Sequence, residues 1–370
     1  MSARLSLEDG VAVVTLDNAP VNALTPAVLD SLFDQLRKVQ RNPDVKAIVL
    51  TGVHGKFCAG FDFTLFGTPQ MSAILDTREE ALKEMGALLE NGPKPTVAAV
   101  EGACLGGGCE LAMACSARVS AKGAQLGLPE VRLGLLPGLG GTQRMPRLVG
   151  MDQALNLMLS AAAVSADDAL SIGLVDEVVP SADLMAAARA AALELAAGSR
   201  PRRRTLQLTH HMPASGEGFV AAGRAIQDAQ AQVSRKFAGQ PHLDYLLEAA
   251  AAGLVQGAGA GLQKEGEGFR AAASSRMHRL TLHFFKATRS LKRAPGPLRL
   301  LIQAYLFLGL VFMYFYVRLA YIKTSFMRGY DLARKKGDKK GSGSTSSAST
   351  ASGSGAGGSK AAAAGARKKK

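Results

Sequence analysis

Residues 96–117 read TVAAVEGACLGGGCELAMACSA and are the most informative part of the sequence for local structure. The apolar run Thr96–Val100 is short and is followed by small residues, which predicts a buried strand. Gly106–Gly108 predicts a turn whose backbone another group can approach closely. Residues Cys109–Ala117 predict a short helix, so a helix N-terminus with unpaired N–H groups begins at that turn. The stretch therefore predicts a strand, a glycine turn and a helix in direct succession.

Short apolar runs and helical patterns alternate upstream of this stretch. Val11–Leu16 and Ala47–Thr51 predict strands, and Pro26–Gln40 predicts a helix, an alternation that indicates an α/β fold. From residue 165 to about residue 253 the patterns are mostly helical. Residues 257–261 carry glycine at every second position, but they lack the GxGxxG spacing and a preceding strand. They predict a turn between helices and not a nucleotide-binding loop.

The basic charge of the chain is confined to its C-terminal part. The chain has a formal net charge of +14, but residues 1–274 carry 24 Lys and Arg against 28 Asp and Glu, and residues 275–370 carry 20 against 2. Residues 341–370 are mostly Gly, Ser, Ala and Thr and end in a basic cluster, which predicts a disordered tail. This tail has no aromatic residues for base stacking, so we predict no nucleic-acid partner.

An apolar segment precedes the tail. Between Leu300 and Val317 the one strongly polar residue is Gln303, and a helix over this stretch would be about 27 Å long. We predict a transmembrane or membrane-embedded helix within residues 298–323, which would bring the protein into contact with a membrane. A buried or surface-lying amphipathic helix is the alternative.

Two glutamates lie in apolar surroundings near the glycine turn. Glu110 lies within the stretch 105–115, and Glu130 lies in the segment GLPEV at 127–131. Two carboxyl groups in an apolar site can act as a general base and a general acid. The glycine turn and a second small-residue turn at 57–62 could each supply a backbone N–H group to the oxygen of a thioester, where negative charge develops. Taken singly, each glutamate is more often an exposed residue of a helix or loop.

Metal-ligating spacings are absent from the sequence. The six histidines are scattered, and none has a cysteine or carboxylate at the spacing of a metal site. We therefore predict no metal and no permanently bound cofactor.

Several segments, in this order and spacing, resemble the signature of the enoyl-CoA hydratase, or crotonase, family. The match includes one segment upstream of the two glutamates and one far downstream of them, so the similarity covers about residues 8–215. The segments are AGFD at 59–62, GGGCELA at 106–112, GLPE at 127–130, PGLGGTQR at 137–144 and ALSIGLVDEVVP at 169–180.

This resemblance implies a fold and a set of site residues. The expected fold is α/β, a crotonase-type spiral of ββα units followed by a helical extension. By position, the N–H groups of Phe61 and Gly107 would form the oxyanion hole, and Glu110 and Glu130 would be the acid/base pair. The expected reaction adds water to a trans-2-enoyl-CoA to give a 3-hydroxyacyl-CoA, with coenzyme A as part of the substrate. A Δ3-Δ2-enoyl-CoA isomerase remains an alternative, as does a membrane-anchored scaffold with this fold but no turnover.

A narrower resemblance concerns residues 243–270, which are similar to the linker helix of peroxisomal multifunctional β-oxidation enzymes. It implies a peroxisomal location, and the family implies trimer-based homo-oligomers, while the apolar segment within residues 298–323 predicts association with a membrane. We expect neither an N-terminal signal nor a Ser-Lys-Leu-type C-terminal tripeptide. The predicted organisation is a crotonase domain at 1–215, a helical linker region at 216–290, the candidate membrane segment and the tail.

Overall fold

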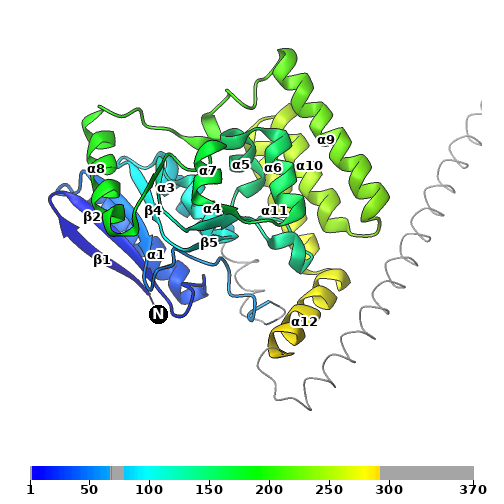
Figure 1. Ribbon diagram of the computed structural model, residues 1–370, viewed down its shortest axis with the longest axis horizontal. Coiled ribbons are helices and arrows are strands. Elements are labelled where there is room, and N and C mark those ends of the chain that lie inside the picture. Colours follow the sequence, from blue (N-terminus) through cyan, green and yellow to red (C-terminus); the bar gives the residue numbers. More distant parts are fainter. Residues whose placement is uncertain (1, 67, 69–78, 292–370) are drawn as a thin grey trace, which may run out of the picture. The chain divides into compact units, whose positions relative to one another are not determined.

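A six-stranded sheet forms the centre of the N-terminal part of the protein (Figure 1). The computed structural model describes residues 2–66, 68 and 79–291. The strand order is β1-β2-β3-β4-β6-β9, with β1 antiparallel to β2 and all other pairs parallel. The strands of this sheet are β1 (Ser2–Glu8), β2 (Val11–Asp17), β3 (Ala47–Gly52), β4 (Thr96–Val100), β6 (Ala117–Ala121) and β9 (Glu177–Val179).

The sheet is buried on both faces, because alternate side chains of its strands pack against different helices. Val49 and Val97 face one way, into a cluster with the small side chains of α8 (Leu184–Ala197). Ile48 and Ala98 face the other way, into the larger core that also includes α1 (Pro26–Arg41). Strands buried on both faces read as continuous apolar runs, which is why the sequence revealed them.

A second, three-stranded sheet lies beside the first and carries the glycine turn. Its order is β5-β7-β8, formed by β5 (Ala103–Leu105), β7 (Gln125–Gly127) and β8 (Val164–Ser165). The remaining elements up to residue 207 are the helices and 3₁₀ turns α3 (Glu79–Asn91), α4 (Gly107–Ala114), η1 (Glu130–Leu133), α5 (Gly141–Val149), α6 (Met151–Ser160), α7 (Ala166–Ser171), η2 (Ser181–Asp183) and η3 (Thr205–Gln207).

Four helices form the extension after this α/β part. They are α9 (Gly216–Lys236), α10 (Pro241–Val255), α11 (Ala258–Ala273) and α12 (Arg276–Leu291). Figure 1 shows α9, α10 and α11 gathered on the side of α5 and α6. Gly253 of α10 and Gly261 of α11 allow this close packing: a Cβ on them would lie 1.8 and 2.1 Å from Oε1 of Gln143 in α5. All described residues belong to one compact unit.

The structure corrects two local predictions. The helix predicted at Cys109–Ala117 is α4, Gly107–Ala114, so it begins inside the glycine turn and ends before β6. Of the turn predicted at 257–261, only Gly257 lies outside α11, because that helix starts at Ala258. Glycine is a poor helix former, but α11 is held by packing against α5 and α10, which outweighs propensity.

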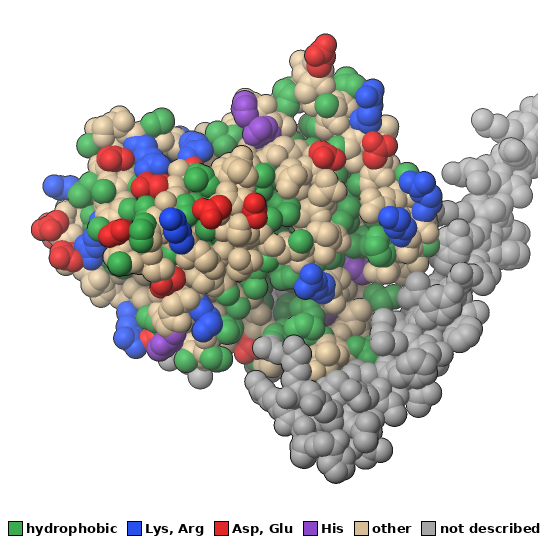
Figure 2. All heavy atoms as spheres, viewed as in Figure 1, with side chains coloured by type: hydrophobic (Ala, Val, Ile, Leu, Met, Phe, Trp, Pro, Cys, Tyr) green, Lys and Arg blue, Asp and Glu red, His purple; other side chains and the backbone are tan. Residues whose placement is uncertain are grey.

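The predicted membrane segment at 298–323 and the tail at 341–370 lie outside the described residues. None of the helices within the described ranges is both long enough and apolar enough to cross a membrane. Figure 2 shows acidic and basic side chains interspersed on the visible face of the described part.

Candidate active site

The small sheet brings three turns together. The N–H of Cys58 donates to the carbonyl of Ala103 (3.0 Å), and the N–H of Leu105 donates to the carbonyl of Cys58 (2.9 Å), which pairs residue 58 with β5. Strand β5 pairs in parallel with β7, so Leu105 lies beside Gly127. Because parallel segments leave a sheet at the same end, the turn at 59–62, the glycine turn and the segment leading to Glu130 meet there.

Glycine is required at two positions of this meeting point. Gly60 has φ +85°, and a Cβ there would lie 2.9 Å from the carbonyl oxygen of Leu105 and 3.1 Å from the nitrogen of Gly107. Gly106 has φ +54°, and a Cβ there would lie 2.7 Å from Oε1 of Glu130. Any larger residue would have to adopt a disfavoured backbone conformation and would push these groups apart.

Two backbone N–H groups point into the space between these turns. The N–H of Leu24 donates to Gly60 and that of Asp62 donates to Leu24, a parallel bridge that leaves the N–H of the intervening Phe61 directed away from Leu24. The N–H of Gly107 is the first of α4, where no intrahelical acceptor exists. Within the described ranges neither N–H has a hydrogen-bond acceptor. The ring of Phe61 lies against Gly107, and a Cβ on the preceding Gly60 would lie 3.1 Å from the nitrogen of Gly107, so the two turns are in close contact.

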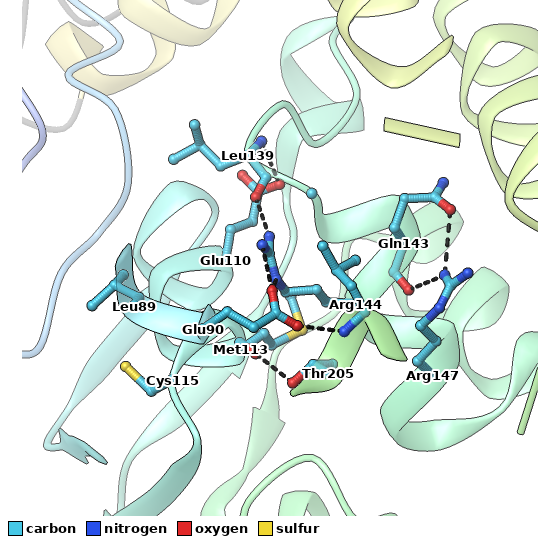
Figure 3. A network of polar contacts seen from close by, with 12 residues as sticks. Leu89, Glu90, Glu110, Met113, Cys115, Leu139, Gln143, Arg144, Arg147 and Thr205 are labelled. Carbon is cyan, nitrogen blue, oxygen red and sulfur yellow. Dashed lines mark hydrogen bonds and ion pairs between the residues drawn. The ribbon is translucent and has the colours of Figure 1, made fainter. Parts of the chain in front are cut away.

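Glu110 lies in the first turn of α4, and its carboxyl group is held by a loop. The residue is 1% exposed, and Oε1 accepts from the N–H groups of Leu139 and Gly141, each at 2.7 Å (Figure 3). Burial raises the pKa of Glu110, and the two amides partly offset this rise. The loop therefore both orients this carboxyl group and stabilises its ionised form.

Glu130 is the first residue of η1 and is held less tightly. Its Oε2 is buried and has no hydrogen-bond partner among the described residues. Burial raises the pKa of Glu130 well above its usual range, and the charge of Glu110 adds to the effect. The two glutamates thus interact electrostatically, and their environments favour a neutral Glu130 beside a better stabilised Glu110.

A buried ion pair between Arg144 and Glu90 supports the same loop. Arg144 binds Glu90 of α3 through Nη2 at 2.9 Å, and its Nη1 donates to the carbonyl of Leu139 at 2.7 Å (Figure 3). Glu90 also accepts a short hydrogen bond from the N–H of Leu206. The loop is therefore fixed through the N–H and the carbonyl of the same residue, Leu139.

The last described helix, α12, contacts residues that follow two of the three turns: Leu133 after Glu130, and Phe63 after the turn at 59–62. His278 Nδ1 and Thr281 Oγ1 bind the carbonyl of Leu133, at 2.6 and 2.8 Å, at the end of η1. Phe285 packs edge-on against Phe63, two residues after Phe61, with ring centroids 5.1 Å apart. The helical extension thus supports the backbone on either side of the candidate site.

A cavity of about 200 Å³ adjoins the site. It extends from Phe61 and Leu139 between α3 and α11, where Ala87, Leu262 and Phe269 line it. Its walls are mostly apolar, while Glu110 and Glu130 are not among its lining residues. The cavity therefore suits an apolar chain. Within the described residues no cluster of His, Cys, Asp or Glu is arranged to hold a metal ion.

The structure brings all four predicted residues, Phe61, Gly107, Glu110 and Glu130, to one place. Sequence reasoning missed two buried glutamates: Glu265 of α11, which binds the Glu110 loop directly, and Glu90 of α3, which acts on it through Arg144. A signal existed for Glu265, because it lies three residues after Leu262 and four before Phe269, on the apolar stripe of its helix. Its partners, however, are about 125 residues away in sequence.

Known proteins resemble this chain over most of the described residues. The family model for enoyl-CoA hydratase/isomerase matches residues 6–240. The glyoxysomal fatty acid beta-oxidation multifunctional protein MFP-a of Cucumis sativus is 42% identical over 290 residues, 78% of this chain and 39% of that protein. The peroxisomal multifunctional protein MFP2 of Arabidopsis thaliana is 41% identical over the same length, with the same coverage of both chains. This chain thus spans about two fifths of the length of these relatives.

Solved structures agree with these sequence matches. An enoyl-CoA hydratase from Bacillus anthracis has a TM-score of 0.50 at 27% identity, covering 77% of this chain and 96% of its own. One from Mycobacterium avium subsp. paratuberculosis has a TM-score of 0.53 at 21% identity, covering 76% and 97%, and supports the fold alone. Family model, relatives and fold lead to the same conclusion: this chain belongs to the enoyl-CoA hydratase/isomerase family, with the crotonase fold.

Proposed function

We propose that this protein is an enoyl-CoA hydratase of fatty-acid β-oxidation, which adds water to a trans-2-enoyl-CoA to give a 3-hydroxyacyl-CoA. The observation that carries the proposal is the pair of electrostatically coupled carboxyl groups, Glu110 and Glu130, beside the two N–H groups of Phe61 and Gly107. The names of the similar plant proteins, which are fatty acid beta-oxidation multifunctional proteins, support the same reaction class.

The proposed mechanism uses each group according to its environment. Glu110, stabilised as a carboxylate by two amides, takes a proton from water, and the resulting hydroxide adds to C3 of the enoyl chain. The electron pair of the double bond moves toward the thioester, and the N–H groups of Phe61 and Gly107 stabilise the enolate oxygen. Glu130, whose pKa is raised by burial and by the charge of Glu110, then acts as the general acid and delivers a proton to C2.

Substrate binding follows from the same arrangement. The acyl chain would extend from the thioester into the cavity between α3 and α11, past Leu139 toward Phe269. The apolar lining would stabilise it by about 25 cal/mol per Å² of apolar surface buried. Coenzyme A is part of the substrate, and the mechanism uses no metal or resident cofactor.

The proposal is tested by the rate at which the full chain converts crotonyl-CoA and a longer 2-enoyl-CoA to 3-hydroxyacyl-CoA. Glu110→Gln and Glu130→Gln should each lower kcat by about 10²- to 10⁴-fold, since each removes one proton-transfer group. Glu248→Gln, on the exposed side of α10, is the matched control and should keep the wild-type rate.

The alternatives predict other outcomes of this experiment. A Δ3-Δ2-enoyl-CoA isomerase would convert a 3-enoyl-CoA and leave the 2-enoyl-CoA without added water. A folded wild-type chain inactive on both substrates would favour the non-catalytic, membrane-anchored scaffold.

We also propose a peroxisomal location and a trimer-based assembly. The names of the relatives, glyoxysomal and peroxisomal, support the location. Membrane contact through residues 298–323 stays a prediction from the sequence. Fractionation of cells that express the full chain tests location and membrane contact, and sedimentation of the purified chain tests the assembly.

A further inference from the structure

The side chain of Glu265 in α11 reaches the N-terminus of α5, within the PGLGGTQR segment at 137–144. It is 2% exposed, and its carboxyl group accepts from the N–H of Gly140 at 2.6 Å and from the N–H of Thr142 at 2.9 Å. The hydroxyl of Thr142 lies in hydrogen-bond contact with the same carboxyl group. Helix α5 has no capping side chain at its own N-cap, Gly140, so Glu265 caps it from another helix.

Two carboxyl groups divide the amides of this loop between them. The N–H groups of Leu139 and Gly141 bind Glu110, and those of Gly140 and Thr142 bind Glu265. Four consecutive amides thus alternate between a carboxyl group of α4 and one of α11. Moving the backbone away from either carboxyl group would move the intervening amides as well.

Packing alone does not account for a glutamate at this position. Burying a carboxyl group costs free energy unless it is hydrogen-bonded or paired. Within the described residues Glu265 has no ion-pair partner, and burial together with the charge of Glu110 raises its pKa to about 8. A leucine would fill the space without this cost, so the hydrogen bonds to the loop are what the glutamate contributes.

The surrounding helices are shaped to bring Glu265 to the loop. Gly261, one turn before Glu265, lets α11 approach the side chain of Gln143. Gln143 Nε2 in turn donates to the hydroxyl of Thr142 at 2.9 Å and to the carbonyl of Ala249 in α10 at 2.9 Å. The hydroxyl of Thr142 is therefore oriented by Gln143 so that its proton is directed to Glu265.

We propose that Glu265 is a positioning residue: it holds the loop 139–142 so that the amides of Leu139 and Gly141 orient the carboxyl group of Glu110 for proton transfer. The inference concerns the proposed hydratase site and rests on that function for its kinetic consequence. The mechanical part, that Glu265 holds the amides which bind Glu110, stands independently of turnover. Through this contact the helical extension sets the geometry of a carboxyl group in the α/β part.

The first test needs no turnover. In the full chain with Glu265→Gln, one carboxyl oxygen becomes an NH₂ group that faces an N–H donor, so at least one loop hydrogen bond is lost. Hydrogen exchange resolved to single amides should then become about tenfold faster or more at Leu139 and Gly141, which bind Glu110 and not Glu265. Faster exchange confined to Gly140 and Thr142 would overturn the proposal, because each carboxyl group would then hold its own amides independently.

The second test separates positioning from substrate binding, since Glu265 also lines the cavity. A misplaced Glu110 should lower kcat for hydration by about 10- to 100-fold with KM changed less than about threefold. A change in KM alone would make Glu265 a cavity residue only. In a Glu110→Gln background, Glu265→Gln should lower kcat no further, whereas additive losses would contradict an effect that acts through Glu110.

Controls separate this effect from general damage to α11. Glu267→Gln makes the same substitution two residues later, at an exposed pair with Lys264, and should exchange and turn over like wild type. If Glu265→Gln does not fold, Thr142→Val removes the hydroxyl with its contacts to Glu265 and Gln143 and should speed exchange at Leu139 and Gly141, while Thr142→Ser restores both contacts. Equal exchange in Val and Ser variants would count against the proposal.

A wild-type chain without turnover would refute the hydratase function and leave the exchange result to decide on Glu265.

Discussion

Glu110 and Glu130 share one site but are held in opposite ways. Glu110 is enclosed by a loop whose two amides bind one of its oxygens, and that loop is anchored by Arg144 and Glu265. Glu130 starts a short 3₁₀ helix and keeps a buried oxygen without a partner among the described residues. Buried polar atoms are normally satisfied, so an unsatisfied one in a site indicates that stability is lost there in favour of chemistry.

The two ends of the proposed proton path are thus built differently. The loop around Glu110 stabilises a negative charge, as a general base requires. The surroundings of Glu130 favour the protonated form, as a general acid requires. A substitution on one side of the site can therefore be compared with the unchanged side.

Among changes outside the two glutamates, the largest effect is expected at Gly106, on the Glu130 side. Gly106→Ala places a Cβ 2.7 Å from Glu130 Oε1 at a positive φ, so Glu130 and the Gly107 N–H must move apart. We expect kcat for hydration to fall by about 10²- to 10³-fold, the loss typical of a displaced oxyanion donor. Gly55→Ala, also at positive φ but with no atom within 4 Å, is the control and should lose stability without losing turnover. Equal turnover in both variants would contradict the proposed oxyanion site.

Truncating each glutamate to alanine tests how much each one contributes to stability, with the free energy of unfolding measured by denaturant titration. Glu110→Ala leaves two amides without an acceptor and should lower that free energy by about 1–3 kcal/mol. Glu130→Ala removes a buried group with an unpartnered oxygen and should leave stability unchanged or raise it. A larger destabilisation from Glu130→Ala than from Glu110→Ala would contradict the claim that Glu110 is the more firmly held of the two.

Histidines buried behind η1 make the Glu130 side sensitive to acid. Burial lowers the pKa of His242, close to Val131, to about 4, and it also lowers the pKa of the neighbouring His278. The unfolded chain therefore binds a proton at His242 more readily, and its contribution to stability is lost as pH falls from about 6.5 toward 4.

The variant His242→Leu isolates this contribution. Between pH 6.5 and pH 5 the wild type should lose roughly 1.5 kcal/mol of unfolding free energy more than His242→Leu does. Thermal unfolding at several pH values measures the difference, with His210→Leu, an exposed histidine, as the control. Parallel pH curves for wild type and His242→Leu would show that His242 is not protonated on unfolding.

The smallest effect is expected at Thr281 of α12, which shares the carbonyl of Leu133 with His278. Thr281→Val should lower the unfolding free energy by about 0.5–1.5 kcal/mol, the value of one hydrogen bond. Since His278 keeps its contact, turnover should fall less than about threefold. Thr288→Val, whose hydroxyl binds a carbonyl of the same helix on its exposed side, serves as the reference. A loss of turnover as large as that of Gly106→Ala would mean that α12, and not the glycine turn, fixes Glu130.

Much of the fold could be predicted, because its strands are buried on both faces. The run Thr96–Val100 was predicted with its observed bounds, and Pro26–Gln40 and Val11–Leu16 each fell one residue short. The strand β1 was missed, since its outer face is exposed and its sequence has no continuous apolar run. The start of α4 was placed two residues late because glycine is rare inside helices, while here the helix N-terminus needs Gly107 and Gly108 for close packing.

The sequence by itself determined the family, through motifs whose order and spacing are local, and with it the proposal that Glu110, Glu130, Phe61 and Gly107 share a site. Only the tertiary structure decided how the two glutamates differ. The loop amides that bind Glu110, the contacts of Arg144 and Glu265, and the histidines behind Glu130 come from segments far apart along the chain. Charge stabilisation and burial depend on distances in space, and no local pattern of residues encodes those distances.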